Sequence, residues 1–401
     1  LRVLAIAQVD GAVIDPVGGL GGLAGRAELL GLVGQLDPPR DEVVAAIARC
    51  RDAGIRVLRL TGDHRATALA IAGRLGLAEP ADAGAAVDGR ELEAMDDDQL
   101  ARALVRVRVF SRVHPAQKLR VVAACQRRGD VVAVTGDGVN DAPALVRADV
   151  GVAMGLAGTE VAKEAAAIVV TDDDFATIGA AIEEGRIVHR NLKKAVLLLA
   201  TTSLAEVLIL VVAMVAGLPA PFLAVQILWN NLVTEGLVTV NLVMEPAEGD
   251  EMRQPPVPAS EPLLTGAMLR RLLVLTPVIV GVVLGWFAWR LHAGVPFARV
   301  RSEAFTLLVV CEWFNVLNCR SHLRSGLDRS VLANRWLVGG LVAGNLLQVA
   351  VIFVPAFQRV FHTVAFAPLT VVAIGAAASL VLWAEELRKW LARRREAQAG
   401  R

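Results

Sequence analysis

The run TGDGVNDAPA at residues 135–144 follows the apolar segment VVAVT at 131–135 and sets the fold of the first half of the chain. Its glycines permit a sharp turn directly after a strand. Asp137 and Asp141 then place two carboxylates where that strand ends. Mg²⁺ prefers oxygen ligands and is usually held by one or two carboxylates together with substrate phosphates. The run therefore predicts a strand followed by a Mg²⁺-dependent phosphate site at the edge of a sheet.

Apolar strands alternate with amphipathic helices up to this run. We expect strands at 1–7, 29–36, 55–60, 107–110 and 131–135, helices at 41–54, 64–76 and 115–128, and an acidic linker at 82–98. Such alternation predicts a parallel sheet, with ligands at the carboxyl ends of its strands.

Two further loops carry polar side chains that suit a phosphoryl group. Thr61, Gly62 and Asp63 directly follow the strand expected at 55–60, and Lys118 lies at the start of a helix. A hydroxyl and an ammonium group would stabilise charge on a transferring phosphoryl group. A Thr-Gly-Asp turn is also common in purely structural roles, so the prediction depends on its combination with the longer run.

The glycine-rich run GGLGGLAG at 18–25 superficially suggests another phosphate-binding loop. It neither follows a clear strand nor opens a strand–helix–strand unit. We therefore interpret it as a surface turn.

The composition separates the chain into two halves. Of its 401 residues 55% are hydrophobic, whereas soluble domains are about 45–50% apolar even when glycine is counted. The excess lies in residues 195–383, while residues 1–190 mix charged and apolar residues as a soluble domain does. A net charge of +1 without a basic domain argues against nucleic-acid binding. The four cysteines and six scattered histidines predict neither a disulfide framework nor a histidine-ligated metal site.

The second half holds six apolar segments, each about long enough to cross a bilayer of ~30 Å. They lie at 195–216, 222–243, 268–291, 304–319, 336–353 and 364–383. Arginines concentrate in the connection 320–335 and in the tail after residue 386, so the positive-inside rule places the soluble domain and the tail in the cytoplasm. Buried helices of a large soluble protein would not predict that asymmetry.

Ionisable and polar residues recur inside these segments, where they are costly and usually functional. The candidates for a cation site are Ser203 and Glu206 in the first segment, Asn231, Thr234 and Glu235 in the second, and Glu312 in the fourth. Carboxylate, amide and hydroxyl oxygens suit a hard cation. Hydrogen bonding between helices is the alternative, and it fits Asn345 and Gln348 better.

These motifs, in this order, resemble those of the P-type cation-transporting ATPases. TGDGVNDAPAL (135–145) matches the hinge signature of that family completely, and four further motifs follow the family order. They are DPPR (37–40), TGDH (61–64), HPAQK (114–118) and GTEVAKEAAAIVVTDDDFATI (158–178). The resemblance covers nearly the whole chain and is closest to the Ca²⁺ pumps and their bacterial relatives.

The resemblance implies a haloacid dehalogenase-like phosphorylation domain that uses Mg²⁺ and ATP. The implied roles are Mg²⁺ ligation by Asp137 with Asp141, shaping of the phosphate site by Asn140 and Asp141, phosphoryl contacts by Lys118 and Thr61, connection to the nucleotide-binding domain at Asp37, and nucleotide phosphate contact by Arg2. The implied partners are the lipid bilayer and a transported cation, with no nucleic acid and no obligate protein partner evident. The implied location is the plasma membrane, with several spans.

Ca²⁺ is the leading ion on this resemblance. Ca²⁺ pumps carry an N-x-x-T-D cluster, and NLVTE (231–235) has Glu235 where that pattern has Asp. Ser203 stands where those pumps usually have Asn. Both departures change the size and length of the ligands, so another cation remains an alternative.

We expect the chain to be the C-terminal part of such a pump. The family attacks ATP with the aspartate of a DKTGT motif, and no Asp-Lys pair occurs here. The TGES-type hydrolytic loop and four earlier spans are also absent, so we expect this chain alone to be inactive. The expected organisation is a remnant of a nucleotide-binding domain (1–34), part of a phosphorylation domain with a parallel sheet (35–190), an all-α six-helix transmembrane domain (191–386) and a basic tail (387–401).

Two other functions stay open. One is a degenerate or regulatory membrane protein that binds ions without ATPase turnover. The other is a phosphohydrolase domain fused to a membrane anchor, which would need its own nucleophile upstream of Thr61. Asp10 and Asp15 are the candidates, but they lie in a Pro/Gly-rich segment and not at a strand end.

Overall fold

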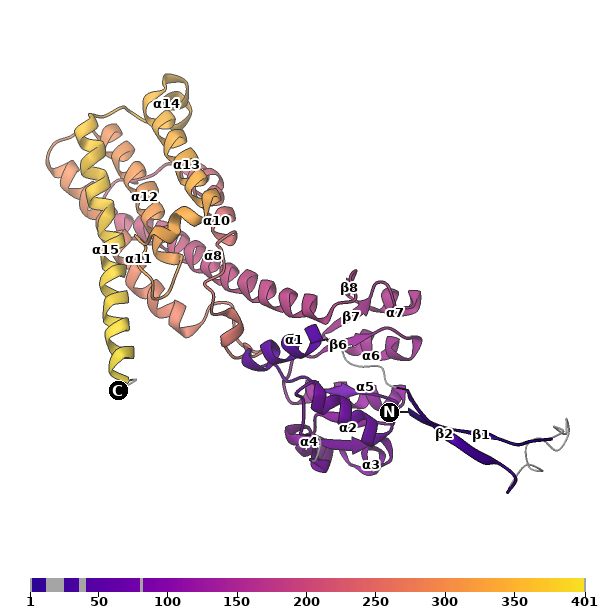
Figure 1. The fold of residues 1–401 in the computed structure, drawn as a ribbon. Helices are drawn as coiled ribbons and strands as arrows, with labels where there is room; N and C mark the ends of the chain where they lie inside the picture. Colours follow the sequence, from indigo (N-terminus) through magenta and orange to yellow (C-terminus); the bar gives the residue numbers. More distant parts are fainter. Residues whose placement is uncertain (1, 12–24, 36–40, 80–81, 400–401) are drawn as a thin grey trace. The chain divides into compact units, whose positions relative to one another are not determined.

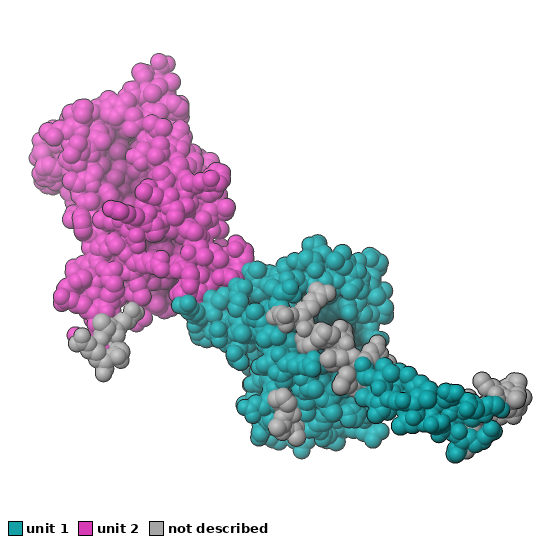
Figure 2. All heavy atoms as spheres, viewed as in Figure 1, with its two compact units in different colours: residues 1–182, 252–259 teal, residues 183–251, 260–401 magenta. Residues whose placement is uncertain are grey.

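The structure is a computed structural model that describes residues 2–11, 25–35, 41–79 and 82–399 (Figure 1). The chain forms two units, residues 1–182 with 252–259 and residues 183–251 with 260–401 (Figure 2). Asp37, the DPPR motif and most of the glycine-rich run lie outside the described residues.

The N-terminal strands form a ribbon of their own. β1 (Arg2–Gln8) pairs antiparallel with β2 (Glu28–Gln35), from Arg2 opposite Gln35 to Gln8 opposite Glu28. Both strands were expected, but the expectation that the second belongs to the parallel sheet is wrong. An apolar run of this length has β character, whereas its pairing partner depends on tertiary context.

Two parallel sheets make up the rest of the strand structure in the first unit. Their strand orders are β3-β5-β4, formed by Arg59–Leu60, Val109–Ser111 and Ala86–Asp88, and β6-β7-β8, formed by Ala133–Gly136, Val150–Met154 and Ile168–Val170. Every pair in both sheets is parallel. The predicted α/β class with parallel strands is confirmed. β3 and β6, which precede the predicted phosphate loops, are both edge strands.

The helices predicted at 41–54, 64–76 and 115–128 are confirmed as α1 (Asp41–Asp52), α2 (Arg65–Arg74) and α5 (Pro115–Arg127). Two further helices, α6 (Ala142–Arg147) and α7 (Glu160–Ala165), pack on β7. Phe110 of β5 is fully buried and shares a core with Val121 and Cys125 of α5. That core fixes the start of α5 beside the end of β5.

The segment 82–98 is not a linker. It contains β4, α3 (Gly89–Ala94) and the start of α4 (Asp97–Arg106). Two of its aspartates, Asp88 and Asp96, are helix caps. Each forms a reciprocal capping box, Asp88 with Glu91 and Asp96 with Gln99, in which each side chain accepts from a backbone N–H of the other residue's end of the turn. Such caps satisfy backbone N–H groups at the helix start, so clustered acids here begin helices and do not interrupt them.

The second unit is helical. After the first part of α8 (Phe175–Val215), its helices are α9 (Ala224–Trp229), the π-helix Asn230–Glu235, α10 (Gly236–Val243), α11 (Gly266–His292), α12 (Phe297–Cys319), α13 (Arg335–Phe353), α14 (Pro355–Phe361) and α15 (Pro368–Ala399). α12 packs against both α11 and α15, and its Phe305 and Leu308 are buried in a core with Ile279 of α11 and Ile374 of α15.

Four helices in the described part of the chain are long and apolar enough to cross a membrane. They cover Phe175–Val215, Gly266–His292, Arg335–Phe353 and Pro368–Arg395. The other two expected spans differ in form. The segment 222–243 is broken into α9, the π-helix and α10, and α12 carries the buried acids Glu303 and Glu312. The predicted count of six spans is therefore not confirmed.

Candidate functional site

The loop after β6 is shaped by a close approach of its own residues. A Cβ at Gly136 would lie 2.5 Å from the Cβ of Asp141, so only glycine lets the loop fold back on itself here. Asp137 follows at the strand end with its side chain exposed, and its carbonyl accepts a hydrogen bond of 2.8 Å from the backbone N–H of Thr159. The loop is thus fastened at both ends while the Asp137 carboxylate stays accessible. Asn140 is exposed in the same loop.

Lys118 and Asp141 connect the ends of β5 and β6. Lys118 lies in the first turn of α5, and its Nζ is 2.5 Å from Oδ1 of Asp141. Both side chains are largely buried, at 19% and 16% exposure. An ion pair that is partly shielded from water holds its geometry better than an exposed one.

Thr61, Gly62 and Asp63 form a turn at the end of β3. The Thr61 hydroxyl donates to Asp63 Oδ2 at 2.9 Å, and the Asp63 N–H donates back to that hydroxyl at 3.1 Å. The N–H groups of Arg112 and Val113 donate to the carbonyls of Asp63 and Thr61. These bonds attach the turn to the segment that leads into α5. Lys118 of α5 in turn pairs with Asp141, so the three predicted loops are connected to one another.

The oxygen atoms that these connected loops offer are suitable ligands for Mg²⁺. The exposed Asp137 carboxylate and the neighbouring Asp141 supply oxygen atoms, and Mg²⁺ usually takes one or two carboxylates and leaves its other positions to water or phosphate. Among the described residues no three or more His, Cys, Asp or Glu side chains are grouped to hold a metal by themselves. Arg2, expected to contact nucleotide phosphates, lies in β1, and its side chain is outside the described part.

The second candidate site lies among the helices of the other unit. Glu206 of α8, Glu235 of the π-helix and Glu312 of α12 are 4%, 3% and 1% exposed. None of the ion pairs formed by described residues involves them. Buried carboxylates without a basic partner are costly unless they are protonated or bind a cation.

Asn230 lies between two of these acids. Its Nδ2 donates to Glu206 Oε1 at 2.7 Å and to Glu312 Oε1 at 2.5 Å. The single proton of the Thr234 hydroxyl is shared between the carbonyl oxygen of Asn230, at 2.7 Å, and its side-chain Oδ1, at 2.9 Å. Asn230 therefore joins α8, the π-helix and α12 at one point.

The third acid has a different neighbour. Glu235 accepts a hydrogen bond from the hydroxyl of Thr202, which lies one turn before Glu206 on α8. Among the described residues no three acids are grouped closely enough to hold a metal ion by themselves, so the expected cage of Glu206, Glu235 and Glu312 is not closed here. Oε2 of Glu312 and Nδ2 of Asn315 are buried without a hydrogen-bond partner in the described chain, which leaves polar atoms available to a ligand.

Two of the predicted ligands are more exposed than expected, although the side chain of Asn231 also hydrogen-bonds Glu206. Ser203 and Asn231 are exposed, while their neighbours Thr202 and Asn230 are buried. The α-helical spacing of three and four residues predicted Asn231, Thr234 and Glu235 on one face. A π-helix has i→i+5 hydrogen bonds and more residues per turn, so Asn230, Thr234 and Glu235 are the buried members instead. Only the Asn230-Asn231 doublet in the sequence hinted at this alternative.

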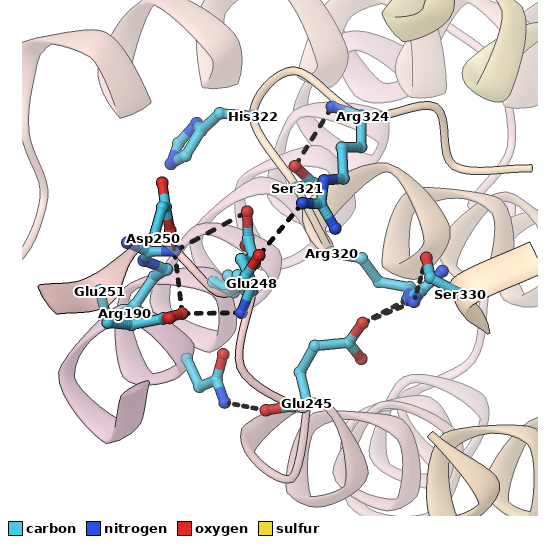
Figure 3. A network of polar contacts seen from close by, with 12 residues as sticks. Arg190, Glu245, Glu248, Asp250, Glu251, Arg320, Ser321, His322, Arg324 and Ser330 are labelled. Carbon is cyan, nitrogen blue, oxygen red and sulfur yellow. Dashed lines mark hydrogen bonds and ion pairs between the residues drawn. The ribbon is translucent and has the colours of Figure 1, made fainter. Parts of the chain in front are cut away.

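A polar network joins the loops at one end of the helices (Figure 3). Arg320, after α12, pairs with Glu245, after α10, at 2.6 Å, and both are buried. Asn334 also donates to Glu245 at 2.9 Å. Nearby, Arg190 of α8 pairs with Asp250 at 2.8 Å and with Glu251 at 3.2 Å. The network fixes the connection between α10 and α11 to α8 and to the loop after α12.

Glu251 and His322, both labelled in Figure 3, have lowered pKa values. Burial acts to raise the pKa of Glu251, but the backbone N–H groups of Glu248 and Gly249, together with Arg190, outweigh it and lower the pKa. Partial burial away from water lowers the pKa of His322 to about 4, and the positive charges of Arg271 and Arg388 act in the same direction.

The chain matches two family models. Residues 219–391 match the C-terminus of cation-transporting ATPases, and residues 8–149 match haloacid dehalogenase-like hydrolases. The two matched segments correspond to the helical unit and to the α/β part of the chain.

Curated relatives extend the match along the chain. It is 45% identical over 366 residues to a probable cation-transporting ATPase F of Mycobacterium tuberculosis, which is 90% of this chain and 40% of that protein. It is 41% identical over 345 residues to a calcium-transporting ATPase of Bacillus subtilis (85% and 38%) and 40% identical over 373 residues to calcium-transporting ATPase 1 of Schizosaccharomyces pombe (91% and 41%). The chain spans about two fifths of the length of these relatives. The chain is therefore similar to cation-transporting ATPases along nearly all of its own length.

Proposed function

We propose that the chain supplies the cation site and part of the phosphoryl-transfer site of an ATP-driven cation pump. The observation that carries the proposal is the set of three buried glutamates, Glu206, Glu235 and Glu312, none of which has a basic partner among the described residues. Amide and hydroxyl groups of Asn230, Thr234 and Thr202 surround them. A membrane-embedded set of this kind is suited to binding a cation or protons reversibly.

Ca²⁺ is the first candidate for the transported cation. The donors are all oxygen or amide groups, which suit a hard ion. Two of the relatives are named as calcium-transporting, while the Mycobacterium tuberculosis relative is named only as cation-transporting. Glu235 is longer than an aspartate at that position, so a different cation is the alternative.

The α/β unit would carry the phosphate chemistry. Asp137 and Asp141 would hold Mg²⁺, which when bound neutralises negative charge on phosphate oxygens. The Lys118 ammonium, fixed by Asp141 at 2.5 Å, would stabilise charge on the phosphoryl group, and the Thr61 hydroxyl would donate to one of its oxygens. Gly62 and Asp63 hold Thr61 in its turn, and Asn140 would shape the phosphate side of the loop.

An attacking aspartate would have to come from outside this sequence, which has no Asp-Lys pair. β3 and β6 both end in proposed phosphate loops, and each is an edge strand of a parallel sheet in the described part of the chain. An added parallel strand could pair with either edge and deliver an aspartate at its carboxyl end, as parallel sheets deliver their ligand-binding loops. Arg2 and Asp37 would serve the nucleotide side of the same reaction, which uses ATP.

The membrane arrangement is part of the proposal. We infer six spans, formed by the four long apolar helices together with the broken segment 222–243 and α12. The arginines of the connection 320–335 and of the tail then favour a cytoplasmic position for the α/β unit and the C-terminus, in the plasma membrane.

The decisive experiment uses the complete pump that contains this chain. Glu312→Gln should weaken cation-dependent phosphorylation by ATP, while phosphorylation by inorganic phosphate persists, because the substitution alters the ion site alone. Loss of both reactions would show that Glu312 supports the fold and not the ion. The competing function, an ion-binding membrane protein without turnover, requires that the complete protein bind the cation and form no phosphoenzyme.

A further inference from the structure

The side-chain nitrogen of Asn230 lies where the two acids Glu206 and Glu312 converge. An asparagine amide carries two N–H groups, and here one is directed to each carboxylate, at 2.7 Å and 2.5 Å. Asn230 is fully buried, and the two acids are 4% and 1% exposed. Hydrogen bonds between an amide and a carboxylate are stronger than those between neutral groups. Asn230 is therefore a direct polar link between α8 and α12.

Thr234 fixes the direction in which the amide points. Its hydroxyl donates to Asn230 Oδ1 at 2.9 Å, so the oxygen side of the amide is turned toward the π-helix and the nitrogen side toward the acids. Reversing the amide would set its oxygen against two carboxylate oxygens and remove a donor from each acid. The partners on both sides thus select one orientation.

A cation bound by the same two acids would need the same position. Direct ligation of Ca²⁺ requires oxygen atoms at about 2.3–2.6 Å from the ion. The Asn230 nitrogen already lies at comparable distances from Glu206 Oε1 and Glu312 Oε1. An ion and an N–H donor cannot share that space, and both would compete for the same oxygen lone pairs.

We propose that Asn230 is an intramolecular latch, whose amide nitrogen takes the place of the cation between Glu206 and Glu312 and must withdraw before the cation binds there. This inference rests on the proposed cation site and adds a residue that opposes binding. The unpartnered Oε2 of Glu312, on a residue 1% exposed, gives that carboxylate a free oxygen with which to begin ligation.

The test measures Ca²⁺ affinity directly, without ATP turnover. The 401-residue chain, purified in lipid nanodiscs, is titrated with radiolabelled Ca²⁺ at fixed pH. Asn230→Leu keeps the branching of the side chain but removes both N–H groups, so the dissociation constant should fall about tenfold, since binding no longer breaks two charge-assisted hydrogen bonds. Asn345→Leu is the matched control, because Asn345 is an exposed amide on α13 that donates only to the carbonyl of Leu341 at 2.8 Å. It should leave the affinity unchanged.

Each outcome decides between distinct roles. Weaker binding in Asn230→Leu would make Asn230 a ligand, and unchanged binding would make it a packing residue; either overturns the latch alone. Asn230→Ala, checked for helix content by circular dichroism, repeats the measurement if the leucine variant does not fold, and it should also bind more tightly. A wild-type chain that binds neither Ca²⁺ nor Mn²⁺ would refute the proposed cation site, and the latch with it.

Discussion

The two candidate sites handle carboxylates in opposite ways. In the α/β unit Asp137 is exposed at a strand end, and its neighbour Asp141 is paired with Lys118. In the helical unit Glu206 and Glu312 are almost fully buried and are bridged by a neutral amide. An exposed acid costs little in water and can accept an ion from solution, whereas a buried acid without a basic partner needs a proton or a cation.

That difference sets what each site tolerates. The exposed site depends on the position of its charges. Removing one carboxylate there should therefore abolish phosphoryl transfer with little effect on the fold. The buried site depends on the balance of charge and hydrogen bonds, so a neutral isostere should change affinity while the helices stay packed. Substitutions in the α/β unit should therefore reduce phosphoenzyme formation, and substitutions in the helical unit should change the cation requirement.

The largest expected effect is at Asp137. In the complete pump Asp137→Ala should abolish phosphoenzyme formation from both ATP and inorganic phosphate, because the phosphoryl group loses the carboxylate proposed to hold Mg²⁺. Acid-stable labelling with radioactive phosphate measures this. Asp98→Ala, at an exposed acid in the first turn of α4, is the control and should retain labelling. Labelling of the Asp137 variant at the wild-type level would remove that residue from the site.

Next in size is the effect of Glu206→Gln on the cation requirement. The amide cannot carry the charge that ligates a hard ion, so the cation concentration needed for half-maximal phosphorylation by ATP should rise by tenfold or more, on the order of one lost charged contact. Phosphorylation by inorganic phosphate should persist. An unchanged cation requirement would mean that Glu206 serves only to join α8 to α12 through Asn230.

The same contrast explains how far sequence could predict the molecule. The loops at the ends of β3, β5 and β6 were predicted correctly in place, because a glycine-rich turn after a strand is encoded by adjacent residues. The face of the segment 230–235 was not, because periodicity assumes an α-helix and the chain forms a π-helix. The wider turn of the π-helix moves burial from Asn231 to Asn230, and the Asn230-Asn231 doublet is the only local hint of it.

Two further errors have different origins. The acids at 82–98 look like a linker in composition, yet Asp88 and Asp96 cap helices whose Leu92 and Leu100 are fully buried. β2 is apolar enough for a sheet core but pairs with β1. For β2 the deciding contact lies outside the segment, where composition and periodicity carry no information. For 82–98 a local signal was present, because an acid followed three residues later by Glu or Gln is the pattern of a capping box.

A smaller effect, on stability, should follow from breaking the network of Figure 3. Arg320→Ala leaves the buried Glu245 without its guanidinium partner, and losing one member of a buried pair costs about 3–5 kcal/mol. Thermal unfolding of the chain in nanodiscs measures the loss. The double variant Arg320→Met, Glu245→Leu should recover much of it, since no buried charge remains. An Arg320→Ala variant as stable as wild type would show that water replaces the partner.

The smallest expected effect is a pH dependence at His322. The pKa of His322 is lowered to about 4 in the folded chain by the protein around it and then by Arg271 and Arg388, against about 6.5 when unfolded. Since the unfolded chain binds the proton more readily, the contribution of His322 to stability is present above pH ~6.5 and is lost as the pH falls toward 4. His322 keeps a solvent-exposed side, so water screens the effect and we expect it to stay below about 1 kcal/mol.

Melting temperatures between pH 7 and pH 4 should show a shallower decline in His322→Leu than in wild type. Arg388→Ala should move the pKa of His322 back up, because one of the repelling charges is gone. An equal decline in all three chains would place the acid sensitivity elsewhere in the network. Glu251 would then be the next residue to replace, because its pKa is lowered in the folded chain and its stabilising charge is lost as the pH falls.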